Sequence, residues 1–81
     1  MKKIRWHQRG QELDLHGLRH EDARKVMVAK VEALWGTDEP LTVITGHSPR
    51  MKEIVSEVLG EYGVRCSEDE MNPGVLRTEI P

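Results

Sequence analysis

Two short polar segments carry residue types that could do chemistry. The first is Asp14-Leu15-His16, which places a carboxylate and an imidazole two residues apart, and the second contains His47. An imidazole can move a proton near neutral pH, and a nearby carboxylate can orient the ring or hold a metal ion. His47 could supply a second proton-transfer group. If these side chains meet around a phosphate, they predict cleavage of a phosphodiester bond on an exposed surface.

The first segment belongs to a stretch, residues 12–16, in which polar and apolar residues alternate strictly. This pattern predicts a strand whose two faces differ, because successive side chains of a strand point to opposite sides. We expect Leu13 and Leu15 to be buried under helices, with Asp14 and His16 on the opposite face. An alternative stays open at this point, because an Asp-x-His on an exposed strand is often ordinary polar surface.

Two helices and three further strands are predicted around this strand. A helical stripe of apolar residues runs from residue 20 to 35 and ends at Gly36, a typical C-terminal cap. Residues 41–45 are rich in β-branched side chains and predict a buried strand. Ser48 and Pro49 suit the N-cap and first position of a second helix, which we expect Gly60 and Gly63 to close. Residues 64–68 and 75–80 then predict two strands joined by a turn.

This order, β-α-β-α-β-β, predicts an α/β two-layer sandwich with a four-stranded mixed sheet and both helices on one face. The first two strands are expected to be parallel, so their carboxyl ends meet at one edge of the sheet. Asp14 and His16 would then lie beside residues 45–48, where the second helix begins. Free backbone N–H groups and the positive end of the helix dipole make that place suitable for a phosphate.

Length and charge limit the possible classes of function. The 81 residues have a mass of 9.3 kDa and predict a single domain without an enclosed cleft. Residues 1–11 contain four basic residues and no acid, whereas the other 70 contain eight basic and fourteen acidic residues. This distribution excludes a uniformly basic nucleic-acid binder and predicts a basic arm on an acidic body. The single cysteine, Cys66, argues against a disulfide or zinc cluster, and the lack of a signal peptide or membrane-length segment predicts a cytoplasmic protein.

The motifs, taken together, resemble those of the small MutS-related (Smr) domain. The similarity covers residues 12–81 and rests on Leu-Asp-Leu-His-Gly-Leu at 13–18, Val-Ile-Thr-Gly-His-Ser at 43–48 and Asn-Pro-Gly-Val-Leu-Arg at 72–77. It implies a fold similar to the C-terminal domain of a bacterial translation initiation factor. It also implies nucleic-acid binding, often with endonuclease activity on DNA or RNA. Asp14 and His16 match the family's Asp-Leu-His motif; Thr45 and Gly46 match half of its Thr-Gly-x-Gly loop, in which Ser48 replaces the second glycine.

The sequence therefore predicts a basic arm at residues 1–11, an Smr-like domain at 12–81, and a nucleic acid as partner, without a membrane. The predicted catalytic residues are Asp14, His16 and His47. The predicted nucleic-acid contacts are Lys2, Lys3, Arg5, Arg19, Thr45, Gly46, Ser48, Arg50 and Lys52. No residue is assigned to a metal site, although Mg²⁺ or Mn²⁺ could take part. Two alternatives remain: a non-catalytic binding or interaction module, and a metal-dependent hydrolase of a small phosphate ester. Trp35 is expected to pack in the core or at a helix end rather than to stack on bases.

Overall fold

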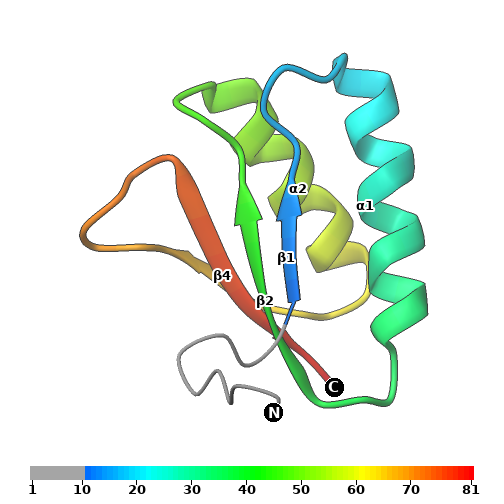
Figure 1. Cartoon of the computed structure of the whole chain (residues 1–81). Coiled ribbons are helices and arrows are strands. Elements are labelled where there is room, and N and C mark those ends of the chain that lie inside the picture. The colour runs from blue at the N-terminus through cyan, green and yellow to red at the C-terminus, as the bar shows by residue number, and fades with distance from the viewer. Residues whose placement is uncertain (1–10) are drawn as a thin grey trace, which may run out of the picture.

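The computed structural model describes residues 11–81, which form two helices packed on one face of a four-stranded sheet (Figure 1). The elements are β1 (Gln11–Asp14), α1 (His20–Leu34), β2 (Glu39–Ile44), α2 (Pro49–Glu61), β3 (Cys66–Glu68) and β4 (Val75–Ile80). The strand order is β1-β2-β4-β3, with β1 and β2 parallel and the other two neighbouring pairs antiparallel. The predicted α/β fold, element order and mixed sheet are confirmed. Of the predicted arm, only Gln11 is among the described residues, and it begins β1.

The core lies between the sheet and the helices and consists of aliphatic side chains. Leu15, Leu41 and Val43 supply the sheet side of this core, and each is at most 1% exposed. The helices contribute the predicted stripes, listed as buried residues Ala23, Met27, Val31, Leu34, Met51, Ile54, Val55, Val58 and Leu59. Full burial of one such side chain contributes about 1.5–3 kcal/mol. The helices are therefore held by this face rather than by their local propensity.

The first strand is shorter than predicted, because its regular pairing ends at Asp14. Leu15 nevertheless continues the register, since its N–H donates to the carbonyl oxygen of Ile44 at 2.8 Å. Leu15 is fully buried, and Leu13 is half-buried against the core because β1 is the edge strand of the sheet. Asp14 and His16 are exposed. The expected difference between the two faces of this segment is present, with Leu13 less deeply buried than expected.

The ends of α1 and α2 differ in one respect from the expectation. Gly36 follows α1 in a left-handed conformation, with φ of 88°, as predicted for a C-terminal cap. Gly60, however, lies inside α2, which continues to Glu61 and has Tyr62 as its C-cap. Trp35 is the C-cap residue of α1, but its side chain is 49% exposed rather than packed in the core. No helix among residues 11–81 is long and apolar enough to cross a membrane.

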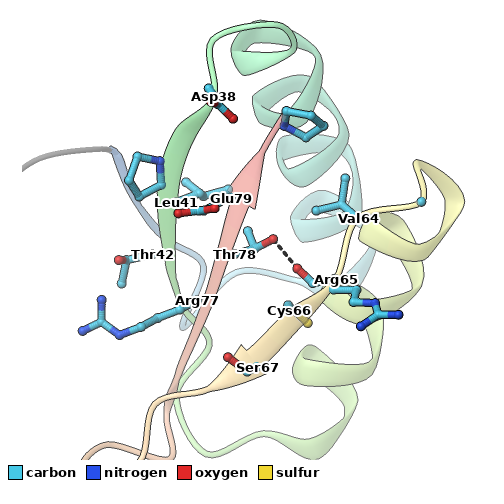
Figure 2. Close-up of a pocket in the computed structure, with 13 residues that line it drawn as sticks. Asp38, Leu41, Thr42, Val64, Arg65, Cys66, Ser67, Arg77, Thr78 and Glu79 are labelled. Carbon is cyan, nitrogen blue, oxygen red and sulfur yellow. Dashed lines mark hydrogen bonds between the residues drawn. The ribbon is translucent and has the colours of Figure 1, made fainter.

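A shallow hollow of about 750 Å³ lies along β4 and the segment that leads into β3 (Figure 2). Thr78 donates a hydrogen bond from Oγ1 to the carbonyl oxygen of Arg65, which holds this segment beside β4. In Figure 2 the guanidinium groups of Arg65 and Arg77 extend away from one another, so they do not converge on a common point. None of the residues that line the hollow is a predicted site residue.

Candidate functional site

The two polar segments meet at one edge of the sheet. The parallel register pairs Asp14 with Ile44, so the chain leaves both strands at the same level. A Cβ placed on Gly46 would lie 3.4 Å from the Cβ of His16, which puts His16 directly beside the turn that follows β2. This turn leads into α2 at Ser48. The predicted neighbourhood of the Asp-Leu-His segment, the Thr-Gly turn and the start of the second helix is therefore present.

Asp14 and His16 form a hydrogen-bonded pair on the surface. The ring nitrogen Nδ1 of His16 lies 2.6 Å from Oδ1 of Asp14, and the backbone N–H of His16 donates to the same oxygen at 3.1 Å. The side chains are 66% and 51% exposed, respectively. With Nδ1 donating to the carboxylate, the unprotonated nitrogen of a neutral ring is Nε2, which lies on the far side of the ring from Asp14. The pair therefore presents a base to solvent.

Asp14 remains negatively charged over the neutral pH range. The hydrogen bond from the side chain of His16, together with the backbone hydrogen bond from the same residue, lowers the pKa of the Asp14 carboxyl below its ordinary value. A carboxylate in this position favours the imidazolium form when His16 takes up a proton. The two side chains thus have the arrangement of a base and its orienting partner.

Thr45 and Gly46 shape the turn from inside. The backbone N–H groups of both residues donate to the carbonyl oxygen of Gly74, at 2.9 and 3.1 Å. Thr45 is only 2% exposed, and its Oγ1 donates to the carbonyl oxygens of Gly46 and Gly74 at 2.9 and 3.2 Å. Gly46 has φ of 69°, a conformation that side chains other than glycine's rarely adopt. The polar groups of Thr45 and the N–H of Gly46 therefore point into the fold rather than toward a ligand.

Gly74 is a part of this site that the sequence did not reveal. A Cβ on Gly74 would lie 3.3 Å from three backbone atoms of Gly46, so the two backbones are in close contact. The Asn72-Pro73-Gly74 segment was interpreted only as a turn, because its contact with Gly46 joins residues that are far apart in the sequence. The presence of glycine at both contact positions is the one signal that could have indicated the approach.

The start of α2 provides the free donors. Ser48 caps the helix as predicted, because its Oγ accepts from the backbone N–H of Met51 at 3.1 Å, and Pro49 is the first helical residue. Among residues 11–81, no acceptor lies within hydrogen-bonding distance of the backbone N–H groups of His47, Ser48 and Arg50. Together with the helix dipole, these groups favour a negative charge at this position.

The predicted cationic contacts are positioned differently from one another. Arg19 is exposed at the start of α1. Arg50 instead lies 3.1 Å from Glu53 and 3.6 Å from Glu57, and Lys52 donates to Glu68 at 2.8 Å. Exposed ion pairs of this kind contribute about 0–1 kcal/mol each, so a phosphate can compete for the cations. Lys2, Lys3 and Arg5 lie outside the described residues.

A divalent cation has one carboxylate ligand here, that of Asp14, and this oxygen is already shared with His16. In the described part of the chain, no three His, Cys, Asp or Glu side chains form a group that could hold a metal ion. The described residues therefore do not fit a protein-held metal, and no step below depends on one. Comparison of the chain with protein-family models, with curated proteins and with solved structures gives no match.

Proposed function

We propose that this domain acts on nucleic acid in the manner of an Smr-type endonuclease and cleaves a phosphodiester bond. The observation that supports this most strongly is the Asp14–His16 pair, whose histidine lies beside the turn into α2. A base with its orienting carboxylate next to a set of unoccupied backbone donors is the minimum arrangement that phosphodiester cleavage requires.

The proposed reaction begins at Nε2 of His16, which removes a proton from the attacking hydroxyl as that oxygen bonds to phosphorus. Asp14 holds the ring in the required tautomer and stabilises the imidazolium that forms. The backbone N–H groups at the start of α2 stabilise the negative charge on the phosphate oxygens. The bond from phosphorus to the leaving oxygen then breaks, and His47 supplies that oxygen with a proton as an auxiliary acid.

The attacking group distinguishes the two substrates. In RNA it is the neighbouring 2′-hydroxyl, so the first products are a cyclic phosphate and a 5′-hydroxyl end. In DNA it is a water molecule, and the product ends are a phosphate and a hydroxyl. Both routes use the same proton transfers by His16 and His47, so the ends of the products report which route this domain follows.

Substrate binding is assigned to groups around this edge of the sheet. Arg19 and the backbone donors of His47 and Ser48 are the contacts nearest to the Asp14–His16 pair. Arg50 and Lys52 would join them by exchanging their carboxylate partners for phosphates, and the predicted arm residues Lys2, Lys3 and Arg5 would add sequence-independent affinity. Thr45 and Gly46 act by holding the turn in place.

The test is a cleavage assay with end-labelled single-stranded RNA and branched DNA, each with Mg²⁺, Mn²⁺ or EDTA. His16→Ala should lose cleavage of whichever substrate the wild-type protein cuts. His20→Ala is the matched control, since His20 is an exposed histidine four residues away at the start of α1. Full activity in His16→Ala would contradict the proposal.

A non-catalytic interaction module is the second candidate. It is favoured by the ion pairs that occupy Arg50 and Lys52, and by the excess of acidic over basic residues in positions 12–81. On this alternative no substrate is cut under any metal condition, and a mononucleotide ester is not hydrolysed either. Saturable hydrolysis of such an ester would instead support the metal-dependent phosphate ester hydrolase.

A further inference from the structure

Three side chains form a corner at the other end of the domain, where both helices finish. The rings of Trp35 and Tyr62 lie with their centroids 5.7 Å apart and their planes inclined by 45°. Tyr62 donates a hydrogen bond from its hydroxyl to Oε2 of Glu32 at 2.8 Å. This contact brings a carboxylate against the pair of rings. We call Glu32, Trp35 and Tyr62 the aromatic corner.

The surroundings of the aromatic corner are suited to a positive charge. Trp35 is half exposed, and the face of an indole ring attracts cations. Neither α1 nor α2 has a basic residue in its last turn, so the negative ends of both helix dipoles are not offset locally. Asp38 follows α1 directly, and Glu39 begins β2. A lysine or arginine side chain is therefore the ligand that this corner would bind.

The chain itself brings basic residues to this end of the domain. Lys30, in the second half of α1, donates from Nζ to Oε1 of Gln11 at 3.3 Å, so β1 begins beside the last turns of α1. Gln11 is also paired with Leu41, two residues beyond Glu39. Figure 1 shows that β1 begins at the end of the molecule where α1 finishes. The segment that precedes Gln11, residues 1–10, therefore joins the domain close to the aromatic corner.

Length and charge both favour this segment as the occupant. Ten residues can span at most about 33–36 Å when extended, whereas α1 as a whole is about 22 Å long, so the aromatic corner is within reach. The segment carries Lys2, Lys3, Arg5 and Arg9 and no acid, and residues 12–81 carry a net charge of −6 from eight basic and fourteen acidic residues. Opposite charges on one chain attract most strongly at low ionic strength.

We propose that the aromatic corner binds basic side chains of the chain's own N-terminal segment, residues 1–10. The segment lies against Trp35 when the salt concentration is low, and the contact combines a cation on the indole face with the carboxylate of Glu32. This contact is independent of the cleavage chemistry at the opposite end of the domain.

The test uses the fluorescence of Trp35 in the full chain. The protein has two tryptophans, so Trp6→Phe leaves Trp35 as the only one. In this parent we expect acrylamide to quench Trp35 weakly at about 10 mM salt and about twofold more strongly at about 1 M salt, where the Debye length falls to about 3 Å. Changing the four basic residues, Lys2, Lys3, Arg5 and Arg9, to glutamine should give the stronger quenching at both salt concentrations.

Two further variants make the result specific. Lys2→Arg with Lys3→Arg keeps the charge of the segment and should quench like the parent, whereas Glu32→Gln removes the carboxylate and should quench like the neutralised protein. Equal quenching of the parent and the neutralised protein at low salt would overturn the proposal. So would quenching in the parent that changes with protein concentration, because the occupant would then be a second copy of the chain.

Discussion

Replacing Ser48 tests how the start of α2 is built and what it binds. Its Oγ accepts from the N–H of Met51 at 3.1 Å, and Met51 is only 3% exposed, so water cannot freely replace the lost acceptor. Ser48→Ala should therefore lower the free energy of unfolding by about 1 kcal/mol. For a domain of this size that corresponds to a fall of about 4–8 °C in the melting temperature, measured by circular dichroism.

Ser48→Asp separates stability from binding. Aspartate is as good an N-cap as serine, and its charge at the helix start adds about 0.3–1 kcal/mol, so this variant should be at least as stable as the wild type. Its carboxylate would also occupy the position proposed for a phosphate, so oligonucleotide binding measured by fluorescence anisotropy should fall. Ser56→Ala, an exposed position within the same helix, is the control and should change stability by less than about 0.5 kcal/mol. Equal loss of stability in Ser48→Ala and Ser48→Asp would refute the cap; unchanged binding by Ser48→Asp would refute the phosphate contact.

Two further predictions concern particular glycines and the single tyrosine. Gly60→Ala, at an exposed helical position where a Cβ meets no atom within 4 Å, should raise stability by about 0.5–1 kcal/mol, whereas Gly74→Ala should lower it by about 1–3 kcal/mol by pressing on the backbone of Gly46. Equal effects in thermal unfolding would refute this contrast. The hydrogen bond to Glu32 raises the pKa of Tyr62 above its ordinary value, so this contribution to stability is complete below about pH 10 and is lost as the pH rises through the raised pKa. Glu32→Gln should bring the pKa of Tyr62 down in an absorbance titration, and an unchanged titration curve would contradict the contact.

The fold was predictable because its elements are encoded by local periodicity. The strict alternation at residues 12–16, the stripes of the two helices and the Ser48-Pro49 start each depend on neighbours within one element. The parallel pairing of β1 with β2 then followed from the helix between them, and it brings His16 to Gly46.

The features that were missed depend on tertiary contacts. The interaction of Thr45 with Gly74 joins residues 29 apart, and nothing in either local pattern indicates it. The same holds for the pairing of Lys52 with Glu68, which changes the environment of a predicted phosphate contact. Trp35 was expected to pack in the core or at a helix end; its cap position agrees, but its half-exposed ring against Tyr62 required the relative placement of the two helices.

The central claim is that His16 transfers a proton in phosphodiester cleavage, and one paired measurement tests it most directly. For His16→Gln and the wild type, the single-turnover cleavage rate and the dissociation constant are measured on the same oligonucleotide. Because the imidazole acts in the transition state, the rate should fall by at least about 100-fold while the dissociation constant changes by less than about twofold. A His16→Gln protein that cleaves at the wild-type rate, or one whose rate falls only as far as its binding does, would contradict the claim.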